Sequence, residues 1–152
     1  MDFSFVTDRL AIGMTPMSVG ELARFTHVID CRDDLDIAPM LSGTRFHNCY
    51  LWAPTEDWRP FADQHKPVEW FRAGIEFALP ILSRPDGRLY VFCKMGANRS
   101  ATMGFAILRA LGMTTAECFA IIDSHRAIDI PGLLECGWWR DAEAALKTLG
   151  YL

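Results

Sequence analysis

The segment Val91-Phe92-Cys93-Lys94-Met95-Gly96-Ala97-Asn98-Arg99-Ser100 joins two different kinds of sequence. The apolar run at 89–92 is typical of a buried strand. The apolar residues after Ser100 keep a helical spacing as far as Gly112, a residue type that commonly ends a helix. The segment is therefore predicted to be a loop that connects a buried strand to a helix.

The residue types in this loop are those of an anion site. Arg99 lies six positions after Cys93, at the expected start of the helix, where N–H groups without helical partners favour an anion. A guanidinium can donate two hydrogen bonds to one phosphate. The same positive surroundings favour the thiolate of Cys93, which is its nucleophilic form. The alternative interpretation is a buried, inert cysteine at an ordinary strand-to-helix junction.

Composition and charge limit the possible classes of protein. The chain has 152 residues, of which 51% are hydrophobic, so we expect one globular domain over residues 1–152. The formal net charge is −4 and no basic run is present, which argues against non-specific nucleic-acid binding without excluding nucleic-acid ends as ligands.

The five cysteines lie far apart and form no CxxC pair, so neither a zinc site nor a disulfide framework is indicated. We expect no metal and no cofactor. The sequence shows no signal-peptide core and no 18-residue apolar run. We therefore expect a cytoplasmic protein that does not contact a membrane. We also expect it to be a monomer.

Strand-like and helical patterns alternate along the chain. Strands are expected at 8–13, 26–31, 46–52 and 89–92, and helices at 18–25, 67–82, 101–111, after Thr114 and at 133–149, with a short helix or loop at 32–43. Ser18 and Thr114 are each followed three positions later by Glu, the capping-box pattern. Three aspartates (33, 34 and 36) are interpreted as a solvated turn. The alternation predicts an α/β fold with a central, mostly parallel sheet flanked by helices.

The motif Cys93-x-x-Gly96-x-x-Arg99-Ser100 resembles the signature of cysteine-dependent protein tyrosine phosphatases, and the short chain resembles their dual-specificity branch. The segments at 10–13 and 27–30 are similar to two strands of that family, and Arg126 with Ile130-Pro131 is similar to the segment before its last helix. The resemblance implies a phosphatase-like fold. It also implies hydrolysis of phosphotyrosine, and of phosphoserine or phosphothreonine, in a phosphorylated protein or peptide.

The resemblance also implies roles for the loop residues. Cys93 would attack phosphorus and carry a cysteinyl-phosphate, Arg99 and the loop amides would hold the phosphoryl oxygens, and Ser100 would hydrogen-bond the sulfur. The substrate-binding loop would be completed by its other members: Lys94, Met95, Gly96, Ala97 and Asn98.

A general acid would come from the loop after the third strand, about thirty positions before the cysteine. Asp57 follows that strand, Asp63 suits the spacing better but lies nearer the next helix, and Glu56 is a third choice. Because loop lengths vary, position is the safer guide and Asp57 is favoured. One departure from the family is Phe92, which stands where a histidine usually precedes the nucleophile, and it implies weaker activation of the thiol.

Two other functions remain open. Asn98 before the arginine also occurs in relatives that act on RNA 5′-phosphates, so an RNA 5′-triphosphatase or another non-protein phosphomonoesterase is the first alternative. The second is a phosphate-binding interaction module with little catalysis. A phosphoinositide pocket is not indicated, because Lys94 has no neighbouring lysine.

Overall fold

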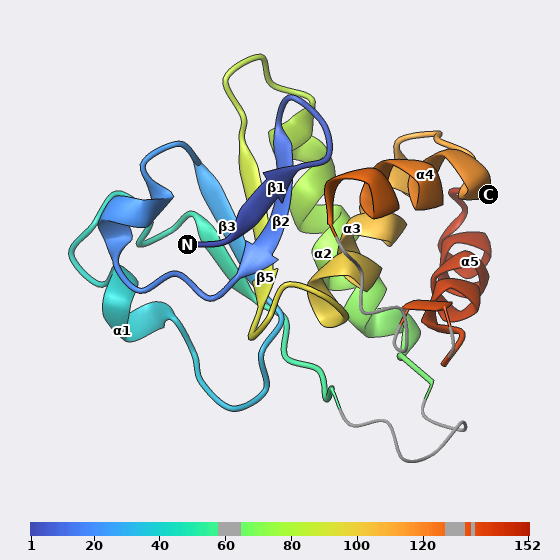
Figure 1. The fold of residues 1–152 in the computed structure, drawn as a ribbon, viewed down its shortest axis with the longest axis horizontal. Helices are drawn as coiled ribbons and strands as arrows, with labels where there is room; N and C mark the ends of the chain where they lie inside the picture. Colours follow the sequence, from blue (N-terminus) through green and yellow to red (C-terminus); the bar gives the residue numbers. More distant parts are fainter. Residues whose placement is uncertain (58–64, 127–132, 135) are drawn as a thin grey trace.

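The computed structural model describes residues 1–57, 65–126, 133–134 and 136–152. Its sheet has the strand order β1-β2-β5-β3-β4 (Figure 1). The strands are β1 (Phe3–Phe5), β2 (Leu10–Met14), β3 (His27–Asp30), β4 (Tyr50–Trp52) and β5 (Leu89–Cys93). Only the β1–β2 pair is antiparallel; β5 is parallel to both of its neighbours, and β3 is parallel to β4. The predicted α/β fold with a mostly parallel sheet is confirmed.

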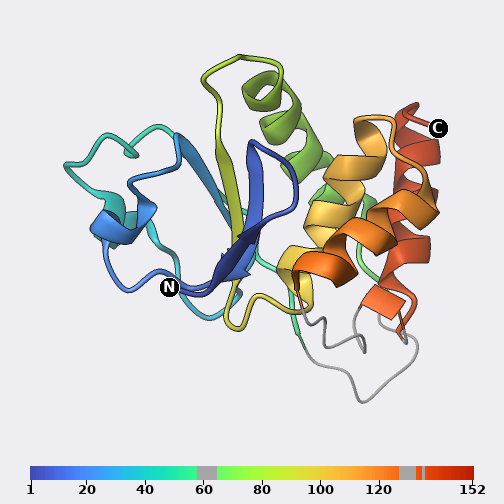
Figure 2. The same cartoon turned by 45° about the horizontal axis from the view of Figure 1, so that its top comes forward.

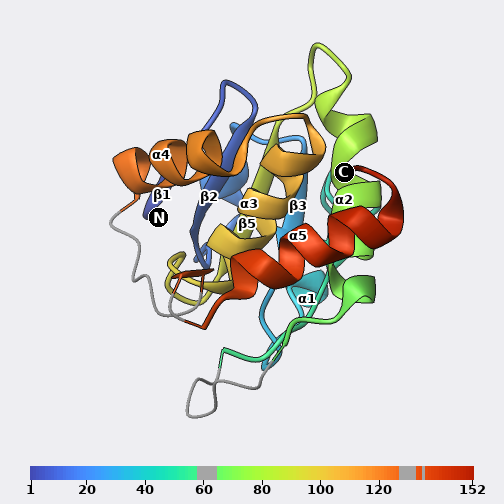
Figure 3. The same cartoon turned by 90° about the vertical axis from the view of Figure 1, so that its right-hand side faces the viewer.

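The helices divide unequally between the two sides of the sheet (Figures 1 and 2). On one side lie α2 (Val68–Leu82), α3 (Arg99–Ala110) and α5 (Trp138–Leu149), with α4 (Thr115–His125) packed on α3. Figure 3 shows these four helices in front of the sheet. The other side carries the short 3₁₀ helix Val19–Leu22, α1 (Ala38–Leu41) and their connecting segments. None of the helices in the described ranges has the length and apolar character needed to cross a membrane.

The central strand β5 is buried on both faces, which explains its continuous apolar sequence. Successive side chains of a strand point to opposite faces. Leu89, Val91 and Cys93 accordingly belong to the core shared with α2 and α3, whereas Tyr90 and Phe92 belong to the core on the other side. Cys93 is thus the last residue of the strand and faces the helical layer.

Several expected boundaries differ in the structure. The strand expected at 46–52 is shorter, Tyr50–Trp52, and Phe46 is buried outside it. The helix expected at 18–25 is a 3₁₀ helix at Val19–Leu22, and the Ser18 side chain makes no capping hydrogen bond. Glu21 instead accepts hydrogen bonds from the Met1 amino group (3.0 Å) and the Met17 N–H (2.5 Å). The second predicted capping box is confirmed, because the Thr114 side chain accepts from the Glu117 N–H and the Glu117 side chain accepts from the Thr114 N–H.

The β1–β2 hairpin was not predicted. β1 pairs with β2 through Phe3 opposite Gly13 and Phe5 opposite Ala11. The rings of Phe3 and Phe5 lie 5.4 and 5.5 Å from that of Phe25. A run of three residues is too short for an alternating pattern to be recognised in the sequence. The aromatic contacts that stabilise β1 come from Phe25, which is distant in the sequence.

Candidate active site

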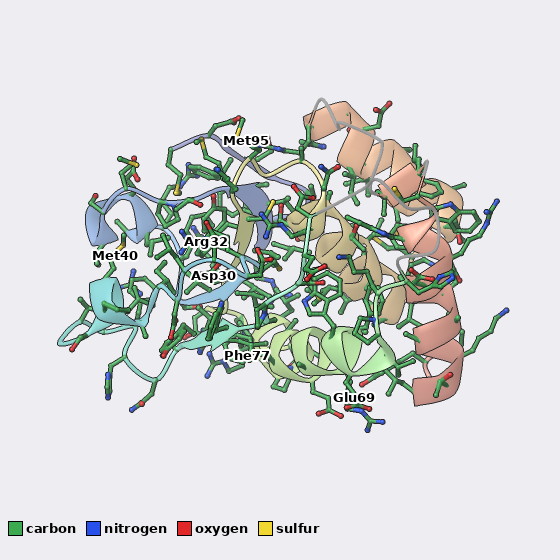
Figure 4. The ribbon with its side chains drawn as sticks, turned by 90° about the horizontal axis from the view of Figure 1, so that it is seen from below. Asp30, Arg32, Met40, Glu69, Phe77 and Met95 are labelled. Carbon is green, nitrogen blue, oxygen red and sulfur yellow. The ribbon has the colours of Figure 1, made fainter. Side chains whose placement is uncertain are left out.

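Three strands deliver chain segments to one edge of the sheet. Cys93 ends β5, residues 31–33 follow β3, and residues 53–57 follow β4. The carboxyl ends of parallel strands meet at the same edge, which is where α/β folds place their ligands. Figure 4 views the molecule from this side, with Asp30, Arg32 and Met95 labelled.

The structure brings Cys93 and Ser100 together. Cys93 is 2% exposed, and its Sγ lies 3.3 Å from the Oγ of Ser100 in the first turn of α3. The Cys93 carbonyl accepts a hydrogen bond from Thr15 Oγ1 (3.2 Å). A serine hydroxyl at this distance can donate to a thiolate, and the first turn of α3 adds N–H groups that have no helical partner. The sulfur therefore lies at a site suited to negative charge.

Gly96 sets the shape of the loop between β5 and α3. Its φ is +73°, and a Cβ atom there would lie 2.4 Å from the backbone carbon of Gly13 and 2.7 Å from Arg126 Nη2. Arg126 is itself held by Asp2, with Nη1 3.0 Å from Oδ1. Only glycine fits between these neighbours, so the loop lies directly against the end of β2 and the Arg126 guanidinium.

Arg99 is buried (3% exposed) and is held along one edge. Its Nη1 donates to Asp33 Oδ1 (2.9 Å) and to the carbonyl oxygen of Thr55 (3.1 Å). Asp33 is 44% exposed, which agrees with the predicted solvated turn, and its carboxylate also accepts a hydrogen bond from the buried arginine. Asp33 was missed because its partner lies 66 positions away and no local pattern marks the pair.

Asp57 lies beside the unpaired part of the same guanidinium. Its Oδ1 is 4.0 Å from Arg99 Nε. Among the described residues, these two are the buried side-chain nitrogen and oxygen atoms that have no hydrogen-bond partner. The distance is too long for a direct hydrogen bond, and buried polar atoms are nearly always paired. The arrangement thus leaves one donor and one carboxylate oxygen available to a ligand.

The other acid candidates are placed less favourably or not at all. The Glu56 side chain is exposed, and only its backbone carbonyl is bonded, to Lys66 Nζ. Asp63 lies outside the described residues. Trp70 of α2 is a core residue whose Nε1 donates to the Ala53 carbonyl (2.8 Å).

Phe92 is fully buried on the sheet face opposite Cys93. Its ring stacks on Tyr90 at 5.6 Å, and the Arg32 guanidinium lies 5.3 Å from its centroid. Arg32 makes a two-point ion pair with Asp30, through Nε to Oδ1 (3.0 Å) and Nη2 to Oδ2 (2.8 Å). Phe92 and this pair support the segment that carries Asp33 to Arg99.

Two other thiols are held in the protonated state. Burial raises the pKa of Cys31 well above its ordinary value, and burial raises the pKa of Cys118 to about 12. Cys31 directly follows β3, and its N–H donates to the Phe92 carbonyl (2.9 Å). These two cysteines are not nucleophiles at neutral pH.

Lys66 is the other site residue that the sequence did not reveal. It is 7% exposed, and its Nζ donates to Thr55 Oγ1 (3.0 Å) and to the Glu56 carbonyl. Burial lowers its pKa from 10.5 to about 8, with the nearby Arg99 charge acting in the same direction and Asp57, Glu56 and Asp33 opposing it. A single lysine before a helix carries no sequence signal that it is buried or that it contacts the segment at 55–56.

The remaining loop residues differ in exposure. Lys94 and Met95 are exposed, Ala97 is half-buried, and Asn98 and Gly96 are buried. Their contacts with a substrate stay a prediction from the sequence.

The chain is similar in fold to several solved phosphatase structures. It superimposes on a mutant form of Tk-PTP with a TM-score of 0.77 at 17% identity, over 99% of this chain and 98% of that one. Human DUSP28 gives 0.73 at 19% identity over 97% and 95% of the two chains. PTPMT1 gives 0.70 at 19% identity over 99% and 100%. The sequence matches no protein-family model and no curated protein. The resemblance to this group of phosphatases is confirmed at the level of the fold.

A Gly96→Ala variant is expected to lose about 2–4 kcal/mol of unfolding free energy, because it combines a positive φ with a backbone clash. Gly43→Ala is the matched control, since Gly43 has a φ of +74° and nothing within 4 Å of its Cβ position. Urea unfolding of both variants measures the difference. Equal losses would contradict the close approach of the loop to β2.

The depressed pKa of Lys66 predicts a pH-dependent stability. Between about pH 8 and pH 10.5 the unfolded chain binds a proton at this lysine that the folded chain has released. The contribution of Lys66 to the free energy of unfolding therefore increases as pH rises through this range. Compared with Lys66→Met, the wild type should gain about 2–3 kcal/mol from pH 7 to pH 10. Urea unfolding at several pH values measures this gain, and a pH-independent difference would contradict a desolvated ammonium.

Proposed function

We propose that this protein is a cysteine-dependent hydrolase of phosphate monoesters. The observation that carries the proposal is the pair of unpaired buried atoms, Arg99 Nε and Asp57 Oδ1, 4.0 Å apart in a site that also holds the Cys93 sulfur. Arg99 can bind a phosphoryl oxygen, Asp57 can transfer a proton, and Cys93 can attack phosphorus. The fold shared with solved phosphatases supports the same assignment.

In the first step the Cys93 thiolate attacks phosphorus and the bond from phosphorus to the leaving oxygen breaks. Arg99 and the loop amides stabilise the charge on the equatorial oxygens. Protonated Asp57 gives its proton to the leaving oxygen, so the alcohol or phenol departs neutral. The product of this step is a cysteinyl-phosphate on residue 93.

In the second step water attacks the same phosphorus and the sulfur leaves. Asp57, now ionised, accepts a proton from the water. The Ser100 hydroxyl, 3.3 Å from Sγ, stabilises the departing thiolate. Inorganic phosphate is released, and both Cys93 and Asp57 return to their starting states.

Phosphotyrosine in proteins or peptides is the proposed substrate class, with phosphoserine and phosphothreonine as further members. The net charge of −4 favours this class over an RNA 5′-end. One structural neighbour, PTPMT1, has been crystallised with PI(5)P. A phosphoinositide and an RNA 5′-triphosphate therefore belong beside phosphopeptides in a substrate screen, and a preference for either would replace the protein-phosphatase assignment.

Wild type should hydrolyse a generic aryl phosphate, and Cys93→Ser should lose all measurable turnover because serine is not ionised at neutral pH. Release of inorganic phosphate measures both. Iodoacetamide should inactivate the wild type with phosphate giving protection, while Cys31 and Cys118 stay unmodified. A protein that binds phosphate but never turns over an aryl phosphate would instead be an interaction module.

Asp57→Asn should keep phosphate binding but lower kcat/KM for phenyl phosphate by about 100-fold or more, because a poor leaving group needs a proton. An activated substrate such as 2,4-dinitrophenyl phosphate should be affected far less. Glu56→Gln is the matched control on the adjacent residue. Unchanged hydrolysis of phenyl phosphate by Asp57→Asn would move the acid role to Asp63.

A further inference from the structure

Lys66 is a lysine buried beside the segment that carries the proposed acid. Lysines are almost never this buried unless they are paired, yet its exposed fraction is 7%. Its Nζ donates to Thr55 Oγ1 (3.0 Å) and to the Glu56 carbonyl, and lies 4.1 Å from the centre of the Trp138 ring. Three contacts of the ammonium therefore compensate for lost water.

The backbone of Lys66 is fastened to helix α5. Its N–H donates to Asp141 Oδ2 (2.8 Å), and the ring Nδ1 of His65 lies 2.8 Å from Asp141 Oδ1. Asp141 is in the first turn of α5. The ammonium thus reaches residues 55–56 from a fixed base and ties together the two ends of the 55–66 segment, which contains Asp57.

Thr55 accepts hydrogen bonds from two different cationic side chains. Its hydroxyl accepts from Lys66, and its carbonyl accepts from Arg99 Nη1 (3.1 Å). Asp57 follows two positions later, and its Oδ1 lies 4.0 Å from Arg99 Nε. The charged groups that face the ammonium are those of Asp57, Glu56, Asp33 and Arg99. A change at Nζ would therefore alter the place of Asp57 relative to the guanidinium.

We propose that Lys66 is a positioning residue that holds Asp57 where it can protonate the leaving group. The inference rests on the proposed phosphatase function and deepens it. Lys66 does not touch the phosphoryl group; it acts through residues 55 and 56. The depressed pKa of about 8 agrees with a desolvated ammonium that remains charged at neutral pH.

A positioning role differs from a purely structural one in its dependence on the leaving group. If Lys66 only stabilised the fold, its loss would reduce the hydrolysis of all aryl phosphates equally. If it positions the acid, the loss appears with poor leaving groups and largely disappears with activated ones. Because kcat/KM reports the step in which the leaving oxygen departs, it is the appropriate rate constant.

The experiment compares Lys66→Met with Lys147→Met, the same change at an exposed lysine of α5. At pH 7, Lys66→Met is expected to lower kcat/KM for phenyl phosphate about 10- to 100-fold, and for 2,4-dinitrophenyl phosphate by less than about 3-fold. Lys147→Met should match the wild type on both substrates. In an Asp57→Asn background, Lys66→Met should add no further loss on phenyl phosphate.

A second variant, Lys66→Arg, retains the positive charge and should recover part of the lost rate on phenyl phosphate. Equal losses on both substrates, or an additive loss in the Asp57→Asn background, would overturn the positioning role and leave the phosphatase proposal intact. A wild type that hydrolyses neither substrate would overturn the phosphatase proposal itself.

Discussion

The burial of the Arg99 guanidinium is the constraint on which the rest of the site depends. A buried cation is costly unless it is paired, and Arg99 is only 3% exposed. Asp33 and the Thr55 carbonyl hold its Nη1, each from a segment that follows a different strand. The chain therefore closes around the arginine from two sides while leaving Nε without a partner. The guanidinium is therefore hydrogen-bonded through Nη1 and keeps an unpaired buried donor at Nε.

The sheet makes this closure possible. β5 lies between β2 and β3, and its last residue, Cys93, pairs in register with Met14 of β2, while Phe92 pairs with Asp30 of β3. The three strand ends are thereby fixed relative to the sulfur. The interior provides further rigidity, since Phe92 packs under Arg32 and the buried Asp30–Arg32 pair. In this protein a phenylalanine occupies the position before Cys93 and supports the neighbouring segment through its contact with Arg32.

The sequence predicts what local patterns encode. The apolar strand at 89–92, the helix after Ser100 and the capping box at Thr114 are all present, because each depends on neighbours within a few residues. The Cys93–Ser100 contact follows from the same short spacing.

Other features required long-range contacts that the sequence does not display. The failed cap at Ser18 arises because Glu21 is taken by the Met1 amino group, 20 residues away. Asp33 and Lys66 contact Arg99 and Thr55 at the carboxyl edge of the sheet, 66 and 11 positions away in the sequence. The sequence does not distinguish Asp33 or Lys66 from an ordinary surface charge. Only the contact of Asp33 with Arg99 and that of Lys66 with Thr55 distinguish them.

A crystal structure of the protein with orthovanadate would show whether Cys93, Arg99 and Asp57 act on one phosphoryl group, because vanadate mimics the five-coordinate phosphorus of the transfer step. We expect vanadium bonded to the Cys93 sulfur, one oxygen accepting a hydrogen bond from Arg99 Nε, and the apical oxygen within hydrogen-bonding distance of Asp57. Vanadate bound away from Cys93, or a guanidinium whose Nε turns to a protein group instead of the anion, would contradict it.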